Sequence, residues 1–155
     1  MVNAYFLDTS ALVKRYIAET GSNWIRSITD VATGNQIALA QITWVEVLSA
    51  LARRQREGSL SASDLNLVVQ HFREDFENQY ELIEIDQALI ETAGELVIQY
   101  PLRAYDAVQL ASALRFQSNL AQIPQEQLVF ISADNRLLDM AQSEGLLTDN
   151  PNNYA

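Results

Sequence analysis

The sequence has 155 residues, of which 48% are hydrophobic and 19% charged. These values are typical of one globular domain and exclude both a disordered chain and two ordinary domains. Twenty acidic and ten basic side chains give a net charge of −10, which repels nucleic acid at long range and argues against sequence-independent DNA binding. Without cysteine, a signal-peptide-like start or an apolar stretch of roughly 18 residues, we expect a cytoplasmic protein with no membrane partner.

Short apolar runs predict strands at residues 4–7, 37–40, 81–85 and 128–131. Helical spacing of apolar residues predicts helices between them, over about 10–17, 22–34, 43–56, 63–76, 86–99, 103–116 and 134–143. We expect Thr9 or Ser10 to cap the first helix. This alternation favours an α/β fold whose mainly parallel sheet is covered on both faces. We interpret residues 1–155 as one domain, ending in a short strand or tail at 146–155.

Four acidic residues lie at or just inside the starts of predicted helices: Asp8, Glu46, Asp106 and Asp134. Asp8 and Asp134 directly follow predicted strands, and the carboxyl ends of parallel strands are where open α/β sheets bind ligands. Hard oxygen donors, with no cysteine and a single histidine, favour Mg²⁺ or Mn²⁺ over zinc. The four residues therefore form a candidate metal site.

Each of these carboxylates also has an ordinary explanation. Aspartate near a helix start most often caps the helix. An ion pair with Arg103, three residues earlier, would account for Asp106. Glu46 lies inside a helix between two valines, where a charge is usually paired or used. The set is therefore more informative than any single member.

Four blocks of sequence contain the four acidic residues: 7–16 (LDTSALVKRY), 43–47 (TWVEV), 102–111 (LRAYDAVQLA) and 131–134 (ISAD). These blocks closely resemble the PIN-domain family, and within it the VapC toxins of bacterial toxin–antitoxin pairs. All four acidic positions match in order, and the resemblance covers nearly the whole chain. Gln109 departs from the pattern, since many relatives carry histidine there, and this puts one local contact in doubt.

The resemblance implies a three-layer α/β/α PIN-like fold with a sheet of four to five strands, and an endoribonuclease that uses one or two Mg²⁺ or Mn²⁺ ions. It makes Asp8, Glu46 and Asp106 the core ligands, directly or through water, with Asp134 completing the cluster. Crowded carboxylates repel one another unless a cation compensates. The implied partners are an RNA substrate, a VapB-like antitoxin that places an arginine or lysine among the carboxylates, and a second copy in a homodimer.

Other residues are candidates for supporting roles. The hydroxyls of Thr9 and Ser132 can hold a carboxylate or a water molecule, although helix capping explains them equally well. Lys14, Arg15 and Arg53 are candidate contacts to the RNA backbone, with a solvated helix surface as the alternative.

Two other functions compete with an antitoxin-controlled nuclease. One is a free-standing PIN nuclease that processes RNA. The other is a non-catalytic α/β interaction module, in which the acids are caps and surface charges. A phosphatase of the haloacid-dehalogenase type is disfavoured, because Ser10 stands where that family has its second aspartate.

Overall fold

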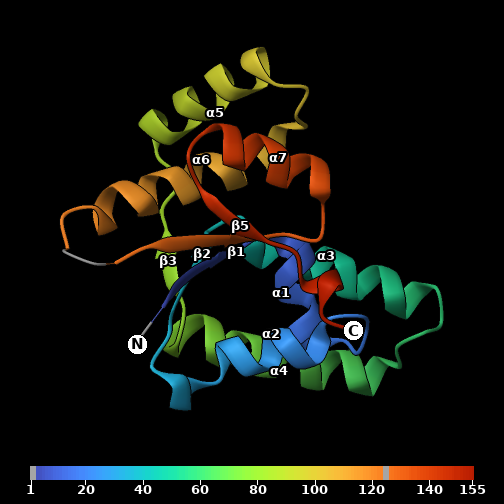
Figure 1. Cartoon of the computed structure of the whole chain (residues 1–155). Helices are drawn as coiled ribbons and strands as arrows, with labels where there is room; N and C mark the ends of the chain where they lie inside the picture. Colours follow the sequence, from blue (N-terminus) through green and yellow to red (C-terminus); the bar gives the residue numbers. More distant parts are fainter. Residues whose placement is uncertain (1–2, 124–125) are drawn as a thin grey trace.

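The computed structural model describes residues 3–123 and 126–155. Its centre is an all-parallel sheet in the order β3-β2-β1-β4-β5. The strands are β1 (Ala4–Leu7), β2 (Gln36–Ala40), β3 (Glu81–Ile83), β4 (Leu128–Ile131) and β5 (Leu147–Asp149). Helices cover both faces of this sheet (Figure 1), so the predicted α/β class and parallel sheet are confirmed. None of the helices in the described ranges is long and apolar enough to cross a bilayer.

Seven α-helices connect or follow the strands in the described part of the chain: α1 (Thr9–Tyr16), α2 (Ser22–Thr29), α3 (Thr43–Arg56), α4 (Ala62–Asn78), α5 (Gln87–Gln99), α6 (Ala104–Leu120) and α7 (Asn135–Ser143). Short 3₁₀ helices occupy Val31–Thr33 and Pro151–Asn153. Figure 1 shows α5, α6 and α7 on one face of the sheet and α1 to α4 on the other.

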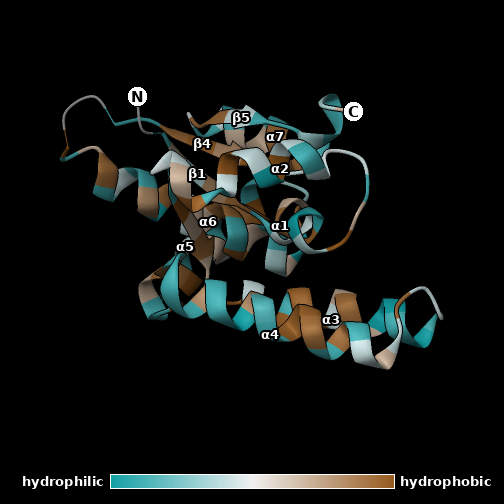
Figure 2. Ribbon diagram, turned by 90° about the horizontal axis from the view of Figure 1, so that it is seen from below, coloured by the Kyte–Doolittle hydropathy of each residue, from teal (hydrophilic) through white to brown (hydrophobic). Residues whose placement is uncertain are grey.

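Alternating side chains along the strands produce two hydrophobic cores. Phe6 packs with the α5–α7 layer and stacks on Phe130 with ring centroids 5.8 Å apart. The next residues along those strands, Leu7 and Ile131, pack with the α1–α4 layer. Successive strand residues face opposite sides, so strands covered on both faces must be hydrophobic throughout. In Figure 2 the buried strand β4 is coloured as hydrophobic, whereas much of helix α4 is coloured as hydrophilic.

Small side chains let α6 lie close to the middle of the sheet. Ala38 and Ala40 on β2 are buried in the same core as Ala107 and Ala111 on α6. Alanine on both surfaces shortens the distance at which a helix and a sheet can pack. This close packing brings the first turns of α6 to the edge where β1 and β2 end.

Several predicted boundaries were wrong for local reasons. Asp8, not Thr9 or Ser10, caps α1, because its carboxylate accepts a hydrogen bond from the Ala11 amide. The segment 22–34 is not one helix, since Asp30 is extended and starts a separate 3₁₀ turn. The strand predicted at 81–85 ends at Ile83, and α6 continues beyond 116 to Leu120.

The C-terminal 3₁₀ turn packs against the start of α2. The ring of Tyr154 stacks on that of Trp24, with centroids 4.2 Å apart and planes 2° from parallel. Gly21, which precedes α2, has φ of +85°, and a Cβ there would overlap the carbonyl oxygen of Pro151. Gly58 has nearly the same φ, +84°, but open space around it.

We predict that Gly21→Ala destabilises the protein more than Gly58→Ala does. The left-handed backbone should cost each variant about 1–2 kcal/mol, and Gly21→Ala should lose roughly 1–3 kcal/mol more through the overlap with Pro151. Urea unfolding measures both losses, and Trp24 fluorescence should report the displaced Tyr154. Equal losses in the two variants would show that the C-terminal turn does not press on Gly21.

Candidate active site

The candidate site lies where the strand order reverses. From β1 the chain adds β2 and β3 on one side, and later β4 and β5 on the other. The carboxyl ends of two such neighbouring strands leave a crevice between the connections that follow them. Asp8 directly follows β1, and Asp134 lies three residues after β4, which pairs with β1. Both residues therefore follow strands that are neighbours in the sheet.

The Asp8 side chain is held at the floor of this crevice. It is only 5% exposed. One carboxylate oxygen accepts hydrogen bonds from the Ser10 hydroxyl at 2.7 Å and the Ala11 amide at 3.0 Å. The other accepts from the Ser132 hydroxyl at 2.6 Å. The carboxylate therefore both caps α1 and ties the end of β1 to the end of β4.

Ser10 and Ser132 each make further hydrogen bonds that hold the loops after β1 and β4. The Ser10 hydroxyl accepts a hydrogen bond from the Ala133 amide at 2.9 Å, and the Ser132 hydroxyl accepts one from the Asp134 amide at 3.0 Å. Ser132 was singled out from the sequence, but Ser10 was considered only as a cap. Its link to Ala133 joins positions more than 120 residues apart, and no local pattern indicates it.

Gln109 links three helices above Asp8. Its buried amide nitrogen donates to Glu46 at 2.8 Å on α3, to the Thr43 hydroxyl at 2.9 Å and to the Thr9 hydroxyl at 3.3 Å. Its amide oxygen is buried, with no hydrogen-bond partner among the described residues. Sequence reasoning treated Gln109 only as a departure from the family pattern. In the structure it holds Glu46, together with a hydrogen bond from the Thr9 side chain.

Burial raises the pKa of three of the four carboxyl groups. For Asp8, desolvation raises the pKa from its usual 3.8 to about 6, against the lowering effect of the two serine hydroxyls and the Ala11 amide. Desolvation is also the largest cause of the raised pKa of Glu46 and of Asp106. Asp106 contributes repulsion to Asp8 and Glu46, and Asp134 contributes it to Asp106. Asp106 is therefore close enough to each of the other three carboxylates for mutual repulsion.

Protein cations compensate this negative charge only weakly. Arg103 lies 3.9 Å from the Asp106 carboxylate, as its i to i+3 spacing predicted, but its side chain is 78% exposed. Such a pair contributes little in water. Asp134 caps α7 by accepting from the Arg136 amide at 2.9 Å. The ordinary explanations for Asp106 and Asp134 therefore hold, but they leave a surplus of negative charge.

The donor set matches the preference of Mg²⁺ or Mn²⁺ for hard oxygen ligands, and raised carboxyl pKa values mark a place where positive charge is stabilising. Across residues 3–123 and 126–155, however, no three acidic, histidine or cysteine side chains are grouped closely enough to hold one ion together. Mg²⁺ commonly keeps several waters and binds through one or two carboxylates. The residues thus suit an ion held partly through water.

Two hollows adjoin the carboxylates. A groove of about 320 Å³ contains Glu46, Thr9 and Arg53 in its lining. A smaller hollow of about 60 Å³ contains Asp106, Asp134 and Arg136. Arg103 lines both. They give solvent, and a ligand of extended shape, access to the site.

Lys14 and Arg15 are engaged elsewhere in the fold. Lys14 is 5% exposed and pairs with Glu19 at 3.1 Å. Arg15 donates to Gln79 and Tyr80 and lies 3.6 Å from Asp75. Neither residue lines the groove beside Glu46, whereas Arg53 does. RNA contacts by Lys14 and Arg15 stay a prediction.

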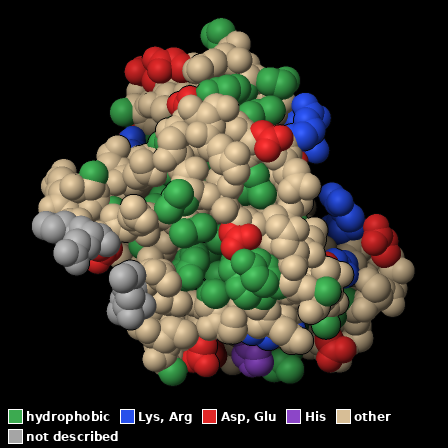
Figure 3. Space-filling model, viewed as in Figure 1, with side chains coloured by type: hydrophobic (Ala, Val, Ile, Leu, Met, Phe, Trp, Pro, Cys, Tyr) green, Lys and Arg blue, Asp and Glu red, His purple; other side chains and the backbone are tan. Residues whose placement is uncertain are grey.

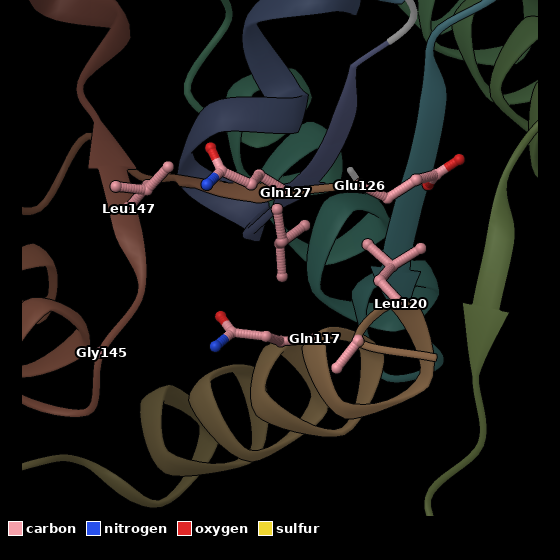
Figure 4. Close-up of a pocket in the computed structure, with 8 residues that line it drawn as sticks. Gln117, Leu120, Glu126, Gln127, Gly145 and Leu147 are labelled. Carbon is pink, nitrogen blue, oxygen red and sulfur yellow. The ribbon is translucent and has the colours of Figure 1, made fainter. Parts of the chain in front are cut away.

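A cavity of about 290 Å³ lies at the amino-terminal ends of β4 and β5, away from the carboxyl ends of the strands where Asp8 and Asp134 lie. Figure 4 shows Gln117 reaching toward it from α6, with Gln127 just before β4 and Leu147 on β5. None of the predicted site residues lines this cavity. It is separate from the carboxylate site.

We predict that Asp8→Asn stabilises the metal-free protein at neutral pH. Because the folded pKa of Asp8 is above its unfolded value, its protonated form favours the fold, and this stability is lost as the pH rises from about 4 through 6. Relative to the variant, the natural protein should gain about 2 kcal/mol between pH 7.5 and pH 4.5. Urea unfolding in EDTA at both values measures it.

The matched control for this experiment is Asp139→Asn on the exposed side of α7, which removes the same charge far from any buried network. Because Asp139 is exposed, this variant shows how removal of a surface charge alone affects stability at the two pH values. The same stability difference for Asp8→Asn at pH 4.5 and pH 7.5 would contradict the raised pKa of Asp8.

Comparisons with known proteins agree with this arrangement. The model of the PIN domain family matches residues 5–142. The chain is 36% identical over 110 residues to Ribonuclease VapC45 of Mycobacterium tuberculosis, covering 70% of this chain and 74% of that protein. The match with the family model therefore includes Asp8, Glu46, Asp106 and Asp134.

Two solved structures share the fold. One is a chain of VapBC2 from Rickettsia felis bound to a DNA fragment from its promoter, with a TM-score of 0.63 and 14% identity over 95% of this chain and 98% of that one. The other is a chain of a toxin–antitoxin complex from Klebsiella pneumoniae, with a TM-score of 0.59 and 22% identity over 95% and 97%. Together with the match over residues 5–142, this means that the chain belongs to the PIN-domain family.

Proposed function

We propose that this protein is a Mg²⁺- or Mn²⁺-dependent endoribonuclease and the toxin of a VapBC-type toxin–antitoxin pair. The observation that supports the proposal is that Asp8 and Asp134 follow strands at the reversal of strand order, while Asp106 repels Asp8, Glu46 and Asp134. The pKa values of Asp8, Glu46 and Asp106 are raised, with burial as the largest cause. The name of its relative, Ribonuclease VapC45, supports the same activity.

In this proposal the four carboxylates hold one or two ions, and some of the carboxylates bind through water. Thr9 and Ser132 orient the carboxylates by hydrogen bonds, Thr9 to Glu46 and Ser132 to Asp8. An ion held by these carboxylates would supply positive charge, which would lower the pKa of a water and stabilise the reacting phosphate. In the hydrolysis, the water oxygen bonds to phosphorus, one phosphorus–oxygen bond breaks, and the leaving ribose oxygen takes a proton.

The carboxylates differ in what they can do in this reaction. Asp8 is buried and fixed by three hydrogen bonds, so it acts by charge and by position. Glu46 and Asp106 are half-buried, with pKa values raised by desolvation. A carboxylate whose pKa is raised toward neutrality is suited to accept the proton of an attacking water.

The same charge surplus supports control by an antitoxin. A lysine or arginine from a partner would relieve the repulsion among the carboxylates as a divalent ion does. One of the proteins with this fold was solved as a toxin–antitoxin complex. In the proposal a VapB-like tail inserts such a side chain at the site and displaces the metal. Loss of metal-dependent cleavage on adding the product of the neighbouring gene tests this step.

We also propose a homodimer that forms through α5. Ile90, Val97 and Ile98 are 45%, 38% and 89% exposed and share one face of this helix, and an exposed apolar stripe of this kind marks an interface. Ile98→Asp should convert a dimer to a monomer in sedimentation equilibrium. Leu67→Asp, on the exposed face of α4, is the control and should leave the dimer intact. A monomeric natural protein, or a dimeric Ile98→Asp variant, would refute pairing through α5.

The nuclease activity itself is tested with purified protein and labelled cellular RNA, in Mg²⁺ or Mn²⁺ and in EDTA. We expect cleavage only with metal, and a loss of at least roughly 100-fold in Asp106→Asn and in Glu46→Gln, because each removes a charge that the metal and the phosphate require. Asp139→Asn should keep the activity of the natural protein.

The outcomes separate the competing functions. Cleavage that persists in EDTA would remove the metal from the proposal. Absence of cleavage by folded protein free of antitoxin, over the whole RNA pool, would favour the interaction module. Metal-dependent cleavage that no neighbouring gene product inhibits would favour a free-standing processing nuclease.

A further inference from the structure

The groove beside Glu46 has two walls that come from different helices. Its volume is about 320 Å³, and its lining residues are Thr9, Glu46, Ser49, Ala50, Arg53, Arg103 and Tyr105. Arg53 follows Glu46 by seven residues on α3 and so lies on nearly the same helix face. Arg103 and Tyr105 come from the start of α6. The groove is therefore bounded by a positive charge on each side, with a carboxylate of the site between them.

Two arginines line this groove in a protein with a net charge of −10. Lys14, Arg15, Arg54 and Arg115 are held in ion pairs within the fold. Within the described part of the chain Arg53 has no ion pair, and Arg103 is held only by its 3.9 Å pair with Asp106, with its side chain 78% exposed. Figure 3 shows Lys and Arg side chains along the right-hand side of the molecule, with Asp and Glu side chains among them, and the strands of Figure 1 run toward this side. Within the groove, Arg53 and Arg103 are the groups that would attract an anion.

Tyr105 adds an aromatic surface to the groove. Its side chain is 50% exposed, and it takes part in none of the aromatic pairs found among residues 3–123 and 126–155. A half-exposed ring in a groove with two arginines matches the way proteins bind unpaired nucleotides, by stacking the base and pairing the phosphate. A base within a duplex already has neighbours on both faces and cannot stack in this way.

We propose that this groove binds one unpaired nucleotide of an RNA next to the phosphate that is cleaved. The base stacks on Tyr105, and its phosphate lies between Arg53 and Arg103. Arg103 also lines the hollow that contains Asp106 and Asp134, so the RNA backbone passes from the groove across the carboxylates. This inference rests on the proposed ribonuclease function, and it makes the substrate single-stranded at this position.

The test measures binding without cleavage, so that a failure of the subsite and a failure of the nuclease are distinguishable. All variants are made in Asp106→Asn protein, which keeps the RNA intact and removes one repelling charge. Fluorescence anisotropy in Mg²⁺ then measures the affinity for a labelled eight-nucleotide oligoadenylate (roughly the length of one single-strand site) and for a duplex RNA of equal charge.

We expect Tyr105→Ala to weaken binding of the single strand by roughly 10-fold or more, since stacking of a base on an aromatic ring has an effect of this size. Tyr105→Phe keeps the ring and should bind within about 2-fold of the parent, because stacking does not need the hydroxyl. Duplex binding should be the same in all three proteins. Arg53→Gln should weaken binding and lower the slope of log affinity against log salt by about 1.

Arg56→Gln is the matched control for Arg53→Gln, because Arg56 is an exposed arginine on the same helix, one turn further, outside the groove. It should change affinity much less. Equal effects of the two arginine variants would overturn the subsite. A Tyr105→Ala variant that binds single strands as well as its parent would also overturn it, and a peptide would then be the alternative ligand of the groove. Equal weakening of single-strand and duplex binding by Tyr105→Ala would overturn it too.

Discussion

The buried Asp8 carboxylate links the loop after β1 to the loop after β4, at the place in the sheet where the strand order reverses. Its oxygens are shared between the Ser10 hydroxyl and the amide of Ala11 after β1 and the Ser132 hydroxyl after β4. These bonds fix both loops, and with them the starts of α1 and α7. Burial of this charge also destabilises the fold at neutral pH, as the raised pKa of Asp8 indicates. The site is therefore built on a charge that stability alone would not retain.

Gln109 links α6, on one face of the sheet, to α1 and α3 on the other face. The alanines of β2 and α6 let α6 lie close to the sheet, and Gln109 then reaches across to Glu46 on α3. Its amide donates a hydrogen bond to the Glu46 carboxylate without adding a charge. A histidine at this position could carry a positive charge, whereas the neutral amide of Gln109 cannot compensate the negative charge of the carboxylates. The packing of small residues and the electrostatics of the site are thus connected through one side chain.

The sequence predicted the sheet class and the location of Asp8 and Asp134, because apolar strands and the residues that follow them are local patterns. It could not predict the link from Ser10 to Ala133 or from Gln109 to Glu46, since each depends on elements more than 60 residues apart. The cap of α1 was wrong because three consecutive residues, Asp8 to Ser10, can all cap a helix. Only the Ser132 contact, which fixes the Asp8 side chain, decides among them.

In the proposed function, the arginines around the site explain how an acidic protein would hold an anionic substrate. Uniform negative charge would repel RNA from every direction. Here the repulsion is interrupted where Arg53 and Arg103 flank the groove, within reach of the carboxylates that require a cation. Under the proposed function, the substrate phosphate, the metal ion and a basic side chain from an antitoxin would all respond to this one charge pattern. The phosphate would pair with the arginines, whereas the metal and the antitoxin side chain would compete for the acids. Activation and inhibition would then be alternative ways of neutralising the same four residues.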